Sequence, residues 1–100
     1  MKNLTLILDN LRSVHNVASI FRTADVFGVS KIILIGTTPT PKDKFDKWRN
    51  DFIKVSLGAE NTVDWEYRKT IAPVFALCKK NNIPIYALEQ SENSKVFNKI

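Results

Sequence analysis

The sequence predicts an α/β fold, a single domain with a parallel sheet and helices on both faces. Short apolar runs at 4–8, 31–35 and 84–88 alternate with segments whose apolar residues recur at helical spacing. Continuous apolar runs are typical of strands covered on both faces, and their alternation with helices implies parallel pairing. The chain has 100 residues, of which 44% are hydrophobic and 25% are charged, as expected for one soluble domain.

The first half of the chain has the clearest pattern. Residues 4–8 predict a buried strand and residues 31–35 predict its neighbour. Between them, apolar residues at helical spacing predict a helix over 17–27; they are Val17, Ile20, Phe21, Ala24 and Phe27. We expect the side chain of Asn16 to cap this helix and Gly28 to end it in the left-handed conformation.

The middle of the chain is less regular. Residues 42–54 are charged, yet they include one apolar stripe that fits a short helix, made of Phe45, Trp48 and Phe52. Around Gly58 we expect a loop, with at most a short strand near Val63. Trp48 and Trp65 lie among basic residues; stacking on bases is one use for them, and packing is the use we expect.

A second helix follows Thr70, which we expect to cap it, and Pro73 is tolerated in the first turn. Its apolar stripe consists of Ile71, Val74, Phe75 and Cys78. The helix should end at residues 81–82, and residues 84–88 then predict another strand. Residues 89–100 are polar with a few apolar side chains and give no clear prediction.

Composition excludes several classes of function. The net charge of +5 favours a polyanionic partner. Cys78 is the only cysteine and there is one histidine, so we expect neither a disulfide nor a metal site. The glycines are isolated at 28, 36 and 58, which argues against Gly-rich phosphate loops. No apolar run is long enough to cross a membrane or to act as a signal peptide, so we expect no membrane contact and a cytoplasmic protein.

Polar residues gather after the first predicted strand, where open α/β sheets place their ligand sites; they are Asn10, Arg12, His15 and Asn16. Arg22 then lies on the helix face away from the apolar stripe. Each residue also has an ordinary explanation. Arg22 could pair with Asp25 on the helix surface, Asn16 could act only as a cap, and His15 could be a surface loop residue.

Taken together, these residues resemble a known motif. The string NLRSVHNVASIFRTADVFG, followed by KIILIG, resembles the first motif of the SpoU (TrmH-like) RNA ribose methyltransferases, which belong to the SPOUT superfamily of knotted α/β enzymes. The match centres on Asn16 and Arg22, followed by Thr23, Ala24 and Gly28. The resemblance continues at residues 56–60 (SLGAE) and 87–89 (ALE), and it covers the whole chain.

This resemblance implies an enzyme that transfers a methyl group from S-adenosylmethionine to a ribose 2′-hydroxyl of tRNA or rRNA. It implies that Arg22 assists or steers the hydroxyl and that Asn16 organises the substrate side, so both are catalytic candidates. Because a guanidinium is always charged, we expect Arg22 to act as a phosphate and oxyanion partner more than as a base. The expected RNA contacts are Asn10, Arg12 and His15. The expected cofactor contacts are Leu88 and Glu89.

Two further motifs of the family, a G-N-E-like turn and an S-L-N-rich segment, do not occur in this sequence. In the family these segments form the knot, enclose most of the cofactor and build the homodimer interface. We therefore expect residues 1–100 to be the N-terminal portion of a SPOUT methyltransferase domain without its knotted C-terminal half, and to bind the cofactor poorly. The alternatives are an inactive remnant and a non-catalytic RNA-binding module, whose RNA binding would be salt-sensitive and independent of cofactor.

Overall fold

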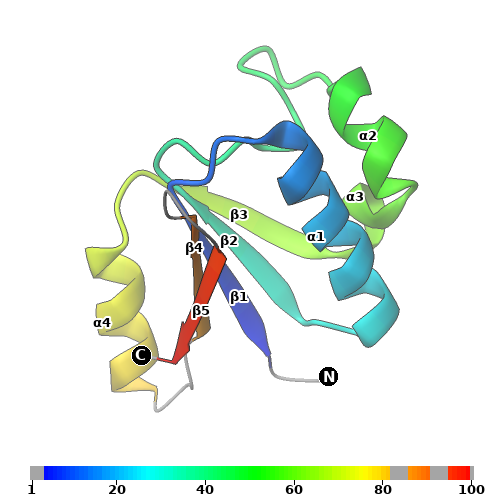
Figure 1. Cartoon of the computed structure of the whole chain (residues 1–100). Coiled ribbons are helices and arrows are strands. Elements are labelled where there is room, and N and C mark those ends of the chain that lie inside the picture. Colours follow the sequence, from blue (N-terminus) through cyan, green and yellow to red (C-terminus); the bar gives the residue numbers. More distant parts are fainter. Residues whose placement is uncertain (1–3, 82–85, 91–94, 100) are drawn as a thin grey trace.

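The computed structural model describes the backbone of residues 4–81, 86–90 and 95–99, and the side chains of residues 4–81. The described residues form one sheet with helices on both faces (Figure 1). In chain order the elements are β1 (Thr5–Asp9), α1 (Val14–Phe27), β2 (Lys31–Ile35), α2 (Asn50–Ser56), α3 (Ala59–Thr62), β3 (Asp64–Arg68), α4 (Ala72–Lys80), β4 (Tyr86–Gln90) and β5 (Lys95–Lys99).

The sheet has the strand order β3-β2-β1-β4-β5. β1 is parallel to β2 and to β4, and β2 is parallel to β3, which confirms the predicted parallel sheet. β5 is antiparallel to β4 and was not predicted. The register places Asp9 opposite Ile35 and Glu89, and Ile35 opposite Arg68. The carboxyl ends of all four parallel strands therefore lie at one edge of the sheet.

Both faces of the central strands are covered. Leu8, Ile32 and Leu34 pack in a core with α1 and α2, where the rings of Phe21 and Phe52 meet edge to face with their centroids 5.1 Å apart. The opposite face packs against α4, which lies on the other side of the sheet (Figure 1); this second core consists of Ile7, Ile33, Ile35, Val74 and Cys78. Alternate residues of β2 thus face opposite cores, which explains its uninterrupted apolar sequence.

The start of α1 differs from the prediction. The helix begins at Val14, and its cap is Ser13, whose Oγ accepts a hydrogen bond from the backbone N–H of Asn16 at 3.1 Å. Asn16 therefore lies inside the first turn and is not the cap. The predicted end is confirmed, because Gly28 is left-handed with φ 69°.

The predicted helical stripe in residues 42–54 is wrong for two of its three members. Only Phe52 lies in a helix, where it is buried, whereas Phe45 and Trp48 precede α2 and are exposed. The reason is local, because the carboxylate of Asp43 accepts hydrogen bonds from the backbone N–H groups of Phe45 and Lys47. Such side-chain bonds to the backbone compete with helix formation.

The second half of the sheet is more regular than the sequence indicated. The strand near Val63 is the five-residue strand β3. The helix α4 follows Ile71, which makes no side-chain capping bond, so Thr70 is not its cap; the predicted burial of Val74 and Cys78 is confirmed. The strand predicted over 84–88 is observed as β4, and its first two predicted positions lie outside the described residues.

Candidate functional site

The loop between β1 and α1 is joined to the end of β2. Asn10 adopts the left-handed conformation with φ 55°, and its backbone N–H donates to the carbonyl of Ile35 at 3.1 Å. Its side-chain Oδ1 accepts from the backbone N–H of Thr37 at 3.1 Å. A Cβ on Gly36 would lie 2.0 Å from that oxygen, so glycine is required there. The two loops therefore have one fixed arrangement.

Two threonines complete this connection. The hydroxyl of Thr38 is buried, accepts from the backbone N–H of Leu11 at 3.1 Å, and lies 2.9 Å from the carbonyl of Leu8. Thr37 Oγ1 donates to the carbonyl of Leu11 at 3.3 Å. The sequence reasoning missed both residues; the available signal was a pair of threonines following a glycine directly after a buried strand.

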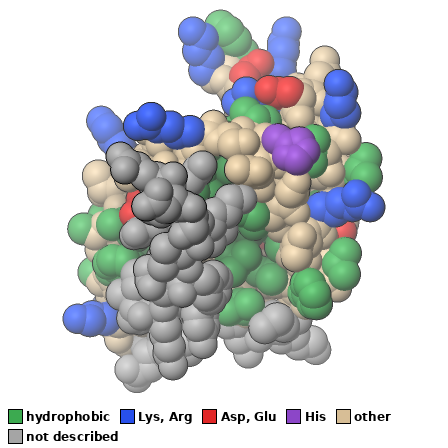
Figure 2. Space-filling view, viewed as in Figure 1, with side chains coloured by type: hydrophobic (Ala, Val, Ile, Leu, Met, Phe, Trp, Pro, Cys, Tyr) green, Lys and Arg blue, Asp and Glu red, His purple; other side chains and the backbone are tan. Residues whose placement is uncertain are grey.

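Asn16 and Arg22 lie on neighbouring parts of the α1 surface. Asn16 is half-buried and borders a hollow of about 310 Å³, whose apolar lining includes Leu4, Leu6, Ile20, Phe27 and Val29. Arg22 is exposed and borders an adjoining hollow of about 400 Å³. Ser19 and Thr23 line both hollows, so they form a polar strip between the two predicted catalytic residues. Figure 2 shows hydrophobic side chains reaching the surface beside the undescribed part of the chain.

The ion pair between Arg22 and Asp25 that would explain Arg22 as an ordinary surface residue is not formed in the structure. Asp25, its expected partner, accepts a hydrogen bond from the hydroxyl of Thr62 at 2.9 Å, which ties α1 to α3. Among the described side chains, no carboxylate lies within ion-pair distance of Arg22. The guanidinium of Arg22 is therefore available to an external anion.

The other predicted contacts lie around the same sheet edge. Arg12 and His15 are exposed, in the loop and in the first turn of α1. The oxygen of the Asn10 carboxamide is committed to Thr37, which leaves its NH2 group for a ligand. Glu89 lies opposite Asp9 in the register of β4 and β1, so the end of β4 is next to the β1–α1 loop. The side chains of Leu88 and Glu89 lie outside the described part of the structure.

The SLGAE segment is a structural turn between α2 and α3. Glu60 is buried, and its Oε1 accepts from the hydroxyl of Ser56 and from the backbone N–H of Gly58. Leu57 and Gly58 both have positive φ values, 52° and 96°. Because α3 also holds Asp25 through Thr62, this turn positions the outer side of α1.

No group of three His, Cys, Asp or Glu side chains in the described part of the chain is placed to hold a metal ion. No helix there is long and apolar enough to cross a membrane.

The fold is that of known methyltransferase structures. A putative RNA methyltransferase of the TrmH family from Porphyromonas gingivalis superimposes with a TM-score of 0.74 and 24% identity, over 91% of this chain and 43% of that chain. The A. aeolicus TrmH/SpoU tRNA modifying enzyme superimposes with a TM-score of 0.72 and 17% identity, over 96% of this chain and 56% of that chain.

The sequence matches relatives of the same kind. The chain is 32% identical over 94 residues to the 23S rRNA (guanosine-2′-O-)-methyltransferase RlmB of Neisseria meningitidis serogroup B, covering 94% of this chain and 35% of that protein. The chain thus spans about a third of that relative's length. The profile of the SpoU rRNA Methylase family matches residues 3–100. This protein chain therefore belongs to the SpoU rRNA methylase family.

Proposed function

We propose that this chain forms the substrate side of an RNA 2′-O-methyltransferase site, with Arg22 as the catalytic residue and Asn16 organising the substrate. The observation that carries this proposal is the exposed guanidinium of Arg22, which has no carboxylate within ion-pair distance among the described side chains. Family membership supports the class of reaction. Arg12 and His15, exposed at the same sheet edge, and the NH2 group of Asn10 are proposed to contact the RNA.

The chemistry suits a guanidinium. A ribose hydroxyl is a poor nucleophile. Negative charge develops on its oxygen as its proton passes to solvent, and the new bond to the methyl carbon then consumes that charge. Arg22 is always charged, so it stabilises that oxygen or holds a neighbouring phosphate by two parallel hydrogen bonds. Preorganised charge of this kind commonly contributes about 10²–10³ in rate.

The methyl donor remains part of the proposal. S-adenosylmethionine would supply an electrophilic methyl group on its sulfonium, and Leu88 and Glu89 would border it after β4. The described side chains contain no donor set that identifies its place, so no step is derived through it. The RNA is proposed to be tRNA or rRNA, because the named relatives act on one or the other. The proposed enzyme is a cytoplasmic homodimer in which residues 1–100 form the N-terminal portion of one SPOUT domain.

The test is methyl transfer from radiolabelled S-adenosylmethionine to RNA by the enzyme that contains this chain. Arg22→Ala should lower kcat at least about a hundredfold, because the oxyanion loses its charged partner. Arg22→Lys should recover part of the loss, since it restores the charge without the bidentate geometry. Lys79→Ala is a matched control, because Lys79 is an exposed cation on α4. Activity of Arg22→Ala within a few-fold of the parent would contradict the proposed role.

A further inference from the structure

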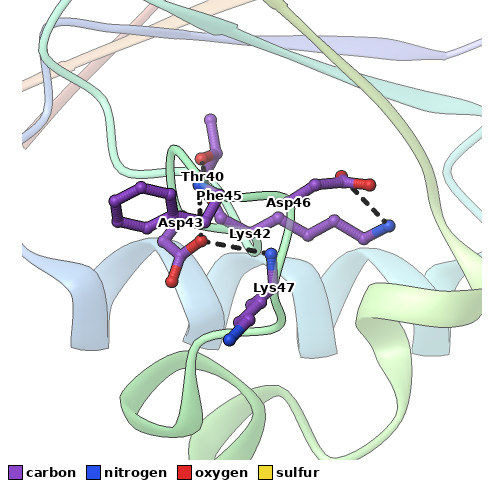
Figure 3. Close-up of polar contacts among 6 residues, drawn as sticks. All are labelled: Thr40, Lys42, Asp43, Phe45, Asp46 and Lys47. Carbon is purple, nitrogen blue, oxygen red and sulfur yellow. Dashed lines mark hydrogen bonds and ion pairs between the residues drawn. The ribbon is translucent and has the colours of Figure 1, made fainter.

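The segment between β2 and α2 contains a small closed loop, residues 40–49, called here the basic-aromatic loop (Figures 1 and 3). Its base is held by the Lys42–Trp48 bridge and by a hydrogen bond from the Arg49 N–H to the Pro41 carbonyl at 2.8 Å. At its tip the carboxylate of Asp43 accepts two backbone N–H groups, as described above. The loop thus has a defined shape before any partner binds.

Two large aromatic side chains are exposed on this loop. Phe45 is 70% exposed and Trp48 is 40% exposed. Each ring makes a cation–π contact with a lysine. Lys42 Nζ lies 4.7 Å from the centroid of the Trp48 ring, and Lys44 Nζ lies 5.2 Å from the centroid of the Phe45 ring. Neither aromatic belongs to the two cores described above.

The charges of the loop are not balanced. Asp46 is paired with Lys42 at 3.5 Å, and Arg49 is paired with Asp51 at 3.0 Å. Lys44 and Lys47 have no carboxylate within ion-pair distance among the described side chains. Figure 2 shows Lys and Arg side chains projecting at the top of the molecule, where Figure 1 places the loop. With the carboxylates of Asp43 and Asp51 also counted, the loop keeps one net positive charge, and the two unpaired lysines lie next to the exposed rings.

An open cavity of about 700 Å³ connects the loop with β3; its lining includes Lys44, Phe45, Arg49, Trp65 and Tyr67. The hydroxyl of Tyr67 donates to the carbonyl of Gly36 at 2.9 Å. Gly36 also contacts Asn10 in the candidate site. The cavity thus reaches the same sheet edge as the β1–α1 loop.

We propose that the basic-aromatic loop is a docking platform for unpaired RNA nucleotides next to the target ribose, with bases stacking on Phe45 and Trp48 and phosphates binding Lys44 and Lys47. This proposal rests on the proposed function, because the loop would bind the same RNA whose ribose lies at Arg22 and would add contacts that Arg22 alone does not make. Exposed rings combined with cations are the usual means of binding single-stranded nucleic acid. Unstacked bases are also what most sequence-specific RNA-binding proteins recognise.

The test uses Trp48 as its own reporter in the 100-residue chain. Trp65→Phe removes the other tryptophan, and titration with a single-stranded oligouridylate of about twelve nucleotides should quench the remaining emission as bases stack. In the parent chain, Phe45→Leu keeps an apolar side chain without the aromatic face and should weaken binding about tenfold. Leu77→Ala, an exposed apolar position on α4, is the matched control and should bind as the parent does.

The lysines have a separate readout. Lys44→Ala combined with Lys47→Ala should lower the slope of log affinity against log salt concentration by about one, because fewer counterions are released. Circular dichroism checks that each variant is folded. The proposal is overturned if Trp48 emission does not change, if Phe45→Leu binds RNA as tightly as the parent, or if polyglutamate quenches Trp48 as RNA does, which would indicate a protein partner.

Failure of this inference and failure of the proposed function give different results. In methylation assays of the enzyme that contains this chain, Phe45→Leu should raise KM with kcat nearly unchanged, whereas Arg22→Ala should lower kcat. An unchanged KM for Phe45→Leu together with a large effect of Arg22→Ala overturns the docking platform alone. No methyl transfer to any RNA by the parent, with Phe45→Leu still weakening RNA binding by the 100-residue chain, overturns the proposed function and not the RNA contact of the loop.

Discussion

Gly36 and Asn10 determine each other at the sheet edge. The backbone of Gly36 has φ 65°, and the carboxamide of Asn10 occupies the space that a Cβ would need. That carboxamide in turn holds Thr37 and the start of the following loop. A glycine here therefore sets both the backbone conformation and the approach of the β1–α1 loop, where the candidate substrate contacts begin.

Gly36→Ala should destabilise the chain by about 2–4 kcal/mol, because positive φ and a steric contact are both penalised. Gly58→Ala is the matched control, since Gly58 has φ 96° but a Cβ there meets no atom within 4 Å. It should cost only the backbone term of about 1–2 kcal/mol. Urea unfolding measures both values. Asn10→Gly combined with Gly36→Ala should lose less stability than the sum of the single changes; equal losses for the two glycine variants would refute the steric contact.

At the scale of the element, α1 has one residue for N-terminal capping, Ser13, and others for the proposed function. Ser13→Ala should lower the free energy of unfolding by about 1 kcal/mol, because the N–H of Asn16 loses its acceptor. Asn16→Ala should change stability by less than half of that, since its side chain makes no capping bond. Urea unfolding of the two variants measures this difference. A larger loss for Asn16→Ala would restore Asn16 as a structural residue and weaken its proposed role with substrate.

The elements that sequence predicted well are those whose pattern reflects burial. β1, β2 and α1 carry uninterrupted or periodic apolar residues because they pack on both sides or along one stripe. Phe45 and Trp48 matched a helical stripe by spacing alone, and hydrogen bonds to Asp43 override that spacing. β3 was underestimated because it alternates charged and aromatic residues at a partly exposed position.

The candidate site was predictable only in part, for the same reason. Arg22 belongs to a helix whose phase is set by its apolar stripe, so its position on the surface followed from the sequence. Asn16 was expected as the cap of that helix and instead lies in its first turn. The connections of Asn10 through Thr37 and Gly36 join residues more than twenty positions apart. Such contacts depend on strand register and loop geometry, which local propensity does not encode.

At the scale of the molecule, the parallel sheet brings separate segments to one edge. The β1–α1 loop, the residues after β2 and the end of β4 converge there because their strands are adjacent and parallel. The basic-aromatic loop reaches this edge through Tyr67 and Gly36. RNA bound along the loop would thus approach the β1–α1 loop without any change of fold.

Isothermal calorimetry of residues 1–100 with S-adenosylmethionine tests whether these residues bind the methyl donor as well as the RNA. We expect no saturable heat, because the two further family motifs do not occur in these residues. Thermal unfolding of the same sample checks that it is folded, and oligouridylate binding checks its RNA side. RNA binding without cofactor binding would place substrate recognition in these residues and the donor site elsewhere. Saturable cofactor binding would instead mean that the end of β4 already forms a donor site, and Leu88 and Glu89 would be the first residues to mutate.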